Sequence, residues 1–288
     1  MIGGDLRRFG GIGLLLLGGA LGGCETMGSA GPNQAVAVVV QENREVTGAN
    51  LASLSDVISR NPSDPAAYNT RGAAYARVGR YGDAIADFTK AVQIDGNYAP
   101  AYTNRALALR QTNKNDQAFQ DFNRAIAADP NYAPALIGRA NLLRVQGNSE
   151  QALADLTQAL RVNPESAEAH HARGLVNQRL NRHREAILDF DAAIDRNPYV
   201  AAPYMARGQS LVATNQFDKA IEDFNASLNV DNRNGDAWAW RGLAYERAGK
   251  TTEARESFQR ALVTDSTNTT ARQGLNRIGG GGGSLFRS

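Results

Sequence analysis

The single cysteine of this 288-residue chain, Cys24, is the residue whose type and position most strongly indicate covalent chemistry. It follows an uncharged apolar stretch from Phe9 to Gly23, which is preceded by Arg7 and Arg8. This order of basic, apolar and small residues is typical of an export signal over residues 1–23. The apolar stretch is 15 residues long, whereas a membrane-spanning helix needs about 20. One cysteine also excludes an internal disulfide framework and a cysteine-rich metal site.

The residues around the thiol, Leu21-Gly22-Gly23-Cys24, resemble the lipobox of bacterial lipoproteins. This resemblance implies that the signal is cut before Cys24, that the thiol receives a diacylglycerol, and that the new amine is acylated, for example with palmitate. Stable anchoring needs at least two acyl chains, which this chemistry supplies. Glu25 stands where aspartate retains many lipoproteins at the inner membrane, which implies the outer membrane, facing the periplasm. The alternative is a plain signal peptide with a chance cysteine.

Charged residues in the rest of the chain recur with a constant period, in six equal blocks without insertion: 65–98, 99–132, 133–166, 167–200, 201–234 and 235–268. Arginine is the seventh residue of every block, and aspartate is the 23rd residue of the first five. If each block folds back on itself near its 15th residue, these two positions lie at the same height. We therefore expect structural ion pairs between Arg71 and Asp87, Arg105 and Asp121, Arg139 and Asp155, Arg173 and Asp189, and Arg207 and Asp223. A ligand-binding row of arginines is the alternative.

The uncharged positions of the blocks show which elements must hold these pairs. The eighth residue is glycine or alanine, the 20th is always alanine, and the 24th is phenylalanine or leucine. This pattern resembles the tetratricopeptide repeat (TPR), which implies an all-α superhelical solenoid of six helix–turn–helix units. Glycine or asparagine near the 15th position suits a helix end with positive φ. On folding back, the glycine at position 8 faces the phenylalanine at position 24, so large meets small.

The flanking segments complete this organisation. Residues 24–48 are expected to form a flexible tether, in which the run 35–40 fits either a short docked strand or an unstructured segment near the bilayer. Residues 49–64 are expected to cap the array with a helix, because Leu51, Leu54 and Ile58 have helical spacing. Residues 269–278 are expected to form a second capping helix, and residues 279–288 a glycine-rich disordered tail.

No catalytic or cofactor motif is present in the sequence, so we expect no enzyme activity, no cofactor and no metal. His170 and His183 occupy positions that hold aromatic residues in other blocks, which predicts packing roles, and only His171 is expected to face a groove. The chain has 31 basic and 29 acidic residues, a balance that argues against a nucleic-acid partner.

The repeat family implies a concave groove formed by the first helix of each unit. The residues expected to bind a partner protein or peptide there are Asn69, Thr70, Asn104, Leu107, Arg110, Ile137, Asn141, Arg144, His171, Gln178, Met205, Gln209 and Trp240. Amides suit a peptide backbone and arginines suit carboxylates, while Met205 and Trp240 are expected to be exposed apolar anchors.

The chain thus resembles TPR lipoproteins that gather cell-wall hydrolases, and pilotin lipoproteins of pilus assembly. This implies a lipid-anchored scaffold for protein partners in the cell envelope. A periplasmic assembly or chaperone factor for outer-membrane or secreted proteins is the alternative. The sequence leaves the partner and the oligomeric state open.

Overall fold

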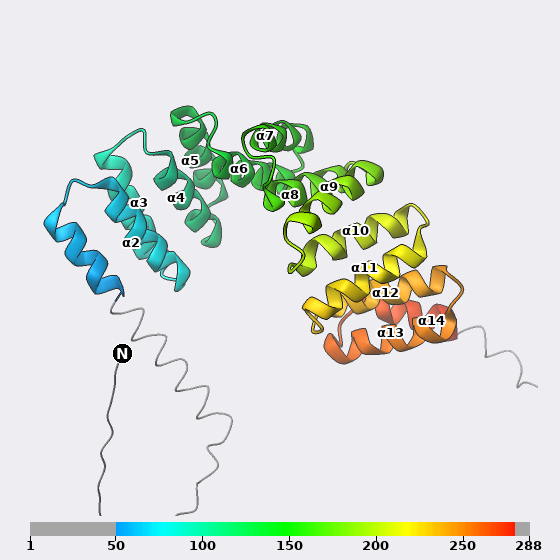
Figure 1. Cartoon of the computed structure of the whole chain (residues 1–288). Helices are drawn as coiled ribbons and strands as arrows, with labels where there is room; N and C mark the ends of the chain where they lie inside the picture. The colour runs from blue at the N-terminus through cyan, green and yellow to red at the C-terminus, as the bar shows by residue number, and fades with distance from the viewer. Residues whose placement is uncertain (1–49, 280–288) are drawn as a thin grey trace, which may run out of the picture. The chain divides into compact units, whose positions relative to one another are not determined.

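The computed structural model describes residues 50–279, and every regular element in this range is a helix (Figure 1). A helix over residues 50–60 comes first, followed by six helix pairs and a last helix. The pairs are α2 (Pro65–Arg77) with α3 (Tyr81–Ile94), α4 (Ala99–Gln111) with α5 (Asn115–Ala128), α6 (Ala133–Gln146) with α7 (Ser149–Val162), α8 (Ala167–Arg179) with α9 (His183–Arg196), α10 (Ala201–Ala213) with α11 (Phe217–Val230), and α12 (Gly235–Arg247) with α13 (Thr251–Thr264). The predicted all-α solenoid is confirmed.

A single helix flanks the six pairs at each end of the described range. The last helix, α14 (Thr269–Gly279), packs against both α12 and α13 and runs one residue beyond the predicted end. The signal segment, Cys24, the tether with its run 35–40, and residues 280–288 lie outside the described residues. Within residues 50–279, no helix combines the length and the apolar character that crossing a bilayer demands.

The two helices of each pair are joined by a turn in which the 15th residue of the block has a positive φ. These six residues are Gly79, Asn113, Gly147, Asn181, Asn215 and Gly249, with φ between 56° and 88°. Glycine has no Cβ to clash in this conformation, and asparagine tolerates it better than most other residues do. The prediction for these turns is confirmed.

A second recurrent turn, which the sequence analysis did not identify, connects one pair to the next. The 31st residue of every block is aspartate or asparagine, and its side-chain oxygen accepts a hydrogen bond from the backbone N–H two residues later. These residues are Asp95, Asp129, Asn163, Asn197, Asp231 and Asp265. Such Asx turns reverse the chain while their side chains satisfy backbone donors.

The core of each pair depends on the phenylalanine or leucine at position 24, which is at most 1% exposed in all six pairs. A Cβ atom added to Gly72 would lie 2.7 Å from the Phe88 ring, so only glycine lets these two helices approach as closely as they do. The same ring position also touches the following pair, because a Cβ at Gly138 would collide with Phe122. Each ring therefore belongs to two neighbouring interfaces, and burial of its apolar surface stabilises both.

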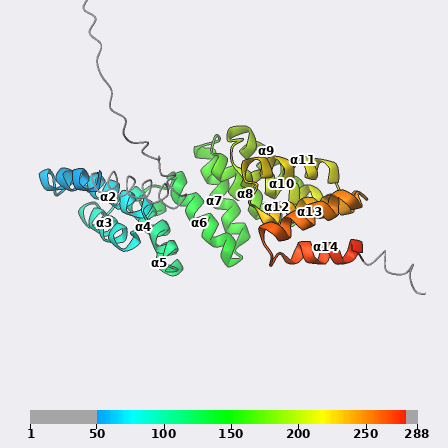
Figure 2. The same ribbon diagram turned by 90° about the horizontal axis from the view of Figure 1, so that it is seen from below.

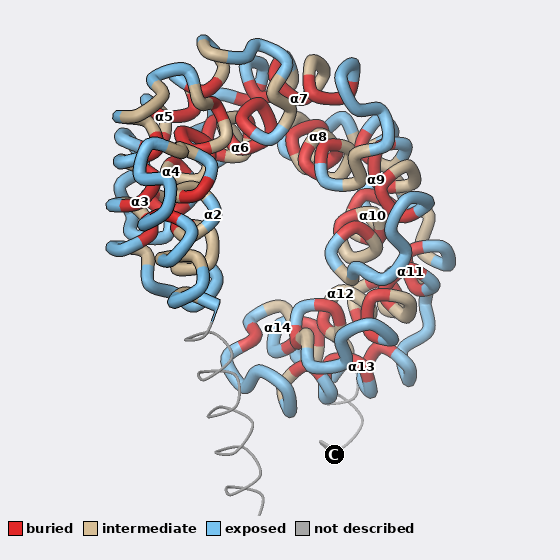
Figure 3. Tube along the Cα trace, turned by 60° about the vertical axis from the view of Figure 1, so that its left-hand side comes forward, coloured by how far each residue is buried: buried red, intermediate tan, exposed pale blue. Residues whose placement is uncertain are grey.

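The helices of the array fall into an inner and an outer set (Figure 3), and Figure 2 shows the same helices from a second side. The first helices, α2, α4, α6, α8, α10 and α12, each contact the next first helix, whereas no second helix in the described range contacts the next second helix. The first helices therefore lie closer together and form the inner side of the array seen in Figure 3. Side chains that point inward from successive first helices share one continuous surface.

Candidate functional site

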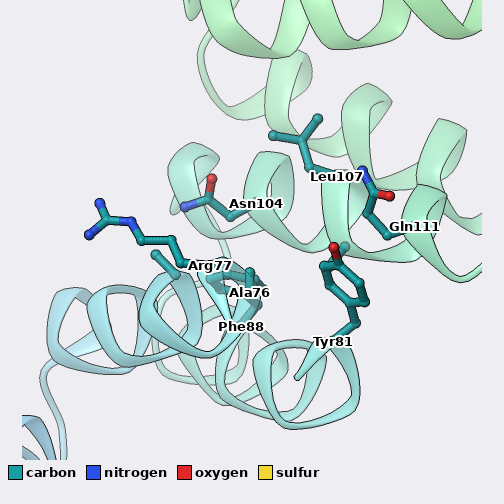
Figure 4. A pocket seen from close by; sticks show the side chains of 9 residues that line it. Ala76, Arg77, Tyr81, Phe88, Asn104, Leu107 and Gln111 are labelled. Atoms are coloured by element: carbon teal, nitrogen blue, oxygen red, sulfur yellow. The ribbon is translucent and has the colours of Figure 1, made fainter. Parts of the chain in front are cut away.

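The inner surface contains a pocket of about 350 Å³ at its N-terminal end, between α2, α3 and α4 (Figure 4). Its walls include Ala76 and Arg77 of α2, Tyr81 of α3, and Asn104, Leu107 and Gln111 of α4. Leu107 is 42% exposed, so an aliphatic group of this wall is open to solvent. The pocket thus combines an exposed aliphatic group with amide, hydroxyl and guanidinium groups, as sites for small ligands and peptide side chains do.

Amide groups on α2 and α4 are tied together beside this pocket. The Asn104 Nδ2 donates to the Asn69 Oδ1 at 2.9 Å across the two helices. Thr70 is exposed, and its hydroxyl donates to the Ala66 carbonyl at 2.8 Å. The amide pair is held by a bond between first helices, so it presents polar atoms at fixed positions on the inner surface.

Further along the inner surface, arginines from three successive first helices lie near one another. These are Arg110 of α4, Arg144 of α6 and Arg179 of α8, and none of them lies within 4.0 Å of a carboxylate in the described part of the chain. Burial lowers the pKa of Arg144, and the charges of Arg179 and Arg110 lower it further. The Arg144 Nε is buried without a hydrogen-bond partner among residues 50–279. This arginine cluster, Arg110, Arg144 and Arg179, is therefore a positive site without a counter-ion in the described chain.

His171 lies half-buried next to this arginine cluster. Its ring centroid is 5.8 Å from that of Phe190, at an angle of 50°. Burial lowers the pKa of His171, and the charge of Arg144 lowers it further. Both effects favour the neutral imidazole, which packs against Phe190.

Two of the residues predicted to line the groove are half-buried glutamines, Gln178 and Gln209, that connect two inner helices. The Gln178 Nε2 donates to the Ala206 carbonyl at 3.1 Å and to the Ser210 Oγ at 3.2 Å, and it lies 3.5 Å from the Gln209 Oε1. These bonds join α8 to α10. Asn141 lies half-buried on α6, the middle of the three helices that carry the arginine cluster.

The large apolar residues predicted to line the groove are mostly packed against the core. Ile137 is only 5% exposed and belongs to the core, so the prediction that it lines the groove is wrong. Met205 and Trp240 are half-buried and pack against the core cluster that contains Leu211 and Phe224. The physical reason is that these side chains lie against the phenylalanine or leucine at position 24, where burial of apolar area is favourable. Ile137 and Met205, at position 5, cluster with that residue of their own unit, and Trp240, at position 6, clusters with that of the preceding unit. Among the predicted groove residues, Leu107, at position 9, is the apolar one that remains exposed.

The arginines at position 7 of the first five units each bind the aspartate at position 23 of the same unit through two nitrogens. Arg105 Nε donates to Asp121 Oδ2 at 2.7 Å, and its Nη2 donates to Oδ1 at 2.8 Å. Equivalent bonds join Arg71 to Asp87, Arg139 to Asp155, Arg173 to Asp189, and Arg207 to Asp223. All five aspartates are buried, so these guanidinium–carboxylate bonds take the place of water for both ions.

The third nitrogen of these arginines makes a bond that sequence reasoning missed. Arg105 Nη1 donates to the Thr89 Oγ1 at 3.1 Å, and Arg139 Nη1 donates to the Asn123 Oδ1 at 2.8 Å. The same link reaches position 25 of the preceding unit from Arg207 and Arg241, where the acceptors are Asp191 and Asn225. From Arg71 it reaches Ser55 in the helix over residues 50–60, which precedes the first unit. Each of these arginines therefore joins two consecutive units. A recurring polar residue at position 25 of the unit before each arginine was the available signal.

Two units depart from this pattern. In the fourth unit, Asn177 Nδ2 donates to the Asp189 Oδ2 at 2.9 Å, and His170 Nδ1 lies 3.7 Å from the Asp189 Oδ1. In the sixth unit, Ser257 replaces the aspartate, and burial lowers the pKa of Arg241.

His183 is half-buried on α9. Within residues 50–279, no group of three histidine, cysteine or acidic side chains could hold a metal ion.

Comparison with known proteins gives matches to a repeat family and to solved structures. Profiles of the tetratricopeptide repeat match residues 65–98, 99–132, 137–201 and 205–269. A search of curated proteins gives no significant match.

Three solved structures illustrate the likeness in fold. A chain of the APC/C hetero-tetramer Cut9-Hcn1 is 19% identical with a TM-score of 0.70, and the match covers 79% of this chain but only 45% of that chain. YrrB, described as a TPR protein with an unusual peptide-binding site, is 24% identical with a TM-score of 0.55 and coverage of 65% and 96%. PilW, described as a widely conserved type IV pilus biogenesis factor, is 16% identical with a TM-score of 0.66 and coverage of 73% and 98%. At these identities the likeness concerns the fold alone.

Proposed function

This chain belongs to the tetratricopeptide repeat family, and from that membership we propose that it is a lipid-anchored adaptor of the bacterial cell envelope that holds partner proteins or peptides in its inner groove. The observation that carries the proposal is the continuous inner surface of six first helices, with a pocket of about 350 Å³ at its N-terminal end. An exposed leucine, paired amides and arginines without counter-ions in the described chain are groups that bind peptide side chains and backbone.

The lipid anchor is proposed from the sequence around Cys24. A signal that ends in Leu-Gly-Gly-Cys supports acylation of the thiol, and Glu25 supports placement at the outer membrane, facing the periplasm. Partners in that compartment include cell-wall enzymes and components of secretion or pilus systems. PilW, which shares this fold, is described as a type IV pilus biogenesis factor, so pilus components are among the partners to test.

Capture of partners in a periplasmic extract tests the adaptor function. The bait is the full chain with Cys24→Ala, alone or with Leu107→Gln, which removes the exposed apolar group of the pocket. Leu188→Gln is the matched control, because Leu188 is 69% exposed on the outer helix α9. We expect a few folded proteins at near-stoichiometric levels, at least fivefold depleted by Leu107→Gln and unchanged by Leu188→Gln. Capture that both variants leave intact would refute the groove as the binding site.

The same experiment separates the adaptor from an assembly or chaperone factor. Broad capture of unfolded outer-membrane or secreted chains, with no stoichiometric folded partner, would favour the chaperone. The anchor is tested separately by fractionation of cells that produce the wild-type or the Cys24→Ala chain. We expect the wild type in the detergent-extracted membrane fraction and the variant in the soluble periplasmic fraction. Equal membrane retention of both would refute the anchor.

A further inference from the structure

Charge is distributed unevenly between the inner and outer helices of the first four units. The inner helices α2, α4, α6 and α8 carry eight arginines and one acidic residue, Glu168. The outer helices α3, α5, α7 and α9 carry ten acidic and five basic residues. The nearly even charge of the whole chain therefore conceals a positive inner side and a negative outer side, which directs anions toward the groove.

Half of the inner arginines are already neutralised. The four at position 7 are paired with buried aspartates, whereas Arg77, Arg110, Arg144 and Arg179 lie beyond 4.0 Å from every carboxylate among the described residues. Arg77 lines the N-terminal pocket, and the other three form the arginine cluster. The groove therefore has unneutralised cations along α2 to α8 and a single glutamate on the same helices.

The arginine cluster has the features of a binding site for an anion. Arg144 contributes a buried nitrogen without a partner in the described chain, and the positive charges of Arg110 and Arg179 disfavour its own charge. Arg179 extends back toward the preceding unit, since its Nη2 lies 4.0 Å from where a Cβ of Gly147 would be. Repulsion among three positive charges destabilises the folded state. Destabilising features of this kind are expected at functional sites, here a site where a ligand of opposite charge binds.

We propose that the arginine cluster binds an acidic peptide segment in an extended conformation, with carboxylates at every third residue. The proposal deepens the adaptor function proposed above and rests on it. Neighbouring packed helices are about 8–10 Å apart. A polyproline-II segment has three residues per turn and rises ~3.1 Å per residue, so every third side chain faces the same way at intervals of about 9 Å. Successive carboxylates can therefore meet successive arginines, each forming charge-assisted bonds.

The surrounding side chains favour a peptide over a nucleic acid. Asn104, Gln111 and Asn141 flank the cluster on α4 and α6 and supply donors and acceptors for a peptide backbone. Tyr102, the one phenylalanine, tyrosine or tryptophan on α4, α6 and α8, is only 9% exposed. Because His171 packs against Phe190, the cluster offers little aromatic surface on which bases could stack.

The test is a fluorescence-anisotropy titration of the full chain carrying Cys24→Ala with three labelled probes. The first is a proline-rich 12-residue peptide with glutamate at every third position, the second has glutamine at those positions, and the third is a 12-mer oligoadenylate. We expect the glutamate peptide to bind at least tenfold more tightly than the glutamine peptide, and binding to weaken as salt rises from 50 to 200 mM. Equal binding of both peptides, or tighter binding of the oligoadenylate, would overturn the proposal.

Variants assign any binding to the arginine cluster. Arg110→Gln, Arg144→Gln and Arg179→Gln should each weaken the glutamate peptide about tenfold. Arg184→Gln is the control, because it removes the same charge from an exposed position on the outer helix α9 and should have no effect. Arg144→Gln should leave the midpoint of thermal unfolding unchanged or higher, since it removes a repelled and partly unpaired cation. A lower midpoint, with peptide binding intact, would show a structural role and overturn the assignment.

The outcome for the adaptor function is separate. If the glutamate peptide does not bind but Leu107→Gln still removes captured folded partners, the acidic ligand is wrong and the adaptor stands. If the peptide binds in an arginine-dependent way and no folded partner is captured, the recognition of acidic segments stands and the adaptor function fails.

Discussion

The sixth unit offers a site where one substitution should complete a recurrent pattern of the array. Arg241 stands opposite Ser257, not an aspartate; its Nε donates to the Ser257 Oγ at 3.2 Å and its Nη1 donates to the Asn225 Oδ1 at 2.8 Å. Burial lowers the pKa of Arg241, whereas the hydrogen bond with Asp121 raises the pKa of Arg105 in the second unit. The change Ser257→Asp supplies the missing carboxylate.

The size of the effect follows from the complete pairs. Asp121 accepts two short bonds from Arg105, and a hydrogen bond to a charged group contributes about 1.5–3 kcal/mol. Ser257 is fully buried, so part of this gain is offset by removing the new carboxylate from water. Five other units hold an aspartate at this position at 4–7% exposure, so the site accommodates it. We expect a net stabilisation of about 1–2 kcal/mol.

Two measurements check this value. Urea unfolding of the full chain with Cys24→Ala gives the total change, and hydrogen exchange of amides in α12 and α13 gives the local change, because units of an array open separately. Ser257→Asn is the control, since it adds an acceptor of similar shape without charge and should give less than half of the gain. If Ser257→Asp is no more stable than the wild type or the asparagine variant, the assumed benefit of the buried pairs is refuted.

Three further predictions address the core, the pairs and the pH dependence. Asp121→Ala should lower the free energy of unfolding by about 3–5 kcal/mol, because it leaves the Arg105 cation without its carboxylate. The double variant Arg105→Ala/Asp121→Ala should lose less than the sum of the two single losses. Additive losses in this double-mutant cycle would exclude the coupling. Gly72→Ala should lower the free energy of unfolding by about 1–3 kcal/mol, because the new methyl group crowds the Phe88 ring. Adding Phe88→Leu should restore part of this stability in urea melts, since the third unit has alanine and leucine, Ala140 and Leu156, at the same two positions. Because the pKa of His171 is lowered in the folded chain, the unfolded chain binds its proton at a higher pH, so the free energy of unfolding should fall as the pH drops below about 6.5. Melts at pH 7.5 and 5.5 should show a smaller loss of stability for His171→Met than for the wild type. An equal loss in both chains would show that His171 does not titrate in this way.

The repeat period predicted much of the fold because the contacts it encodes are local. Positions 7 and 23, and positions 8 and 24, lie in one helix pair, so their pairing requires only that the chain reverse at position 15. The Gly72–Phe88 contact and the turn at Gly79 follow from this rule. The link from Arg105 to Thr89 has the same separation in sequence as the pair with Asp121, but it joins two units, and the fold-back argument says nothing about how units stack.

The groove was predicted less well than the pairs. Thr70, Asn104, Leu107 and Arg110 lie on the inner helices at positions where the surface remains accessible, whereas Ile137 is core and Trp240 packs on the preceding unit. The position of a residue within its unit does not distinguish these cases. Its exposure depends on the tilt of one unit relative to the next and on the size of the neighbouring side chains.

The number of helix pairs, the residues that close their turns and the partners across each pair could all be predicted from the amino-acid pattern. These depend on side-chain size and backbone freedom within a single unit. Which inner side chains stay exposed, and where Arg110, Arg144 and Arg179 come together, became clear only from the folded arrangement of the units. Both depend on how neighbouring units pack against each other. These contacts involve residues of different units, so the residue pattern of a single unit does not predict them.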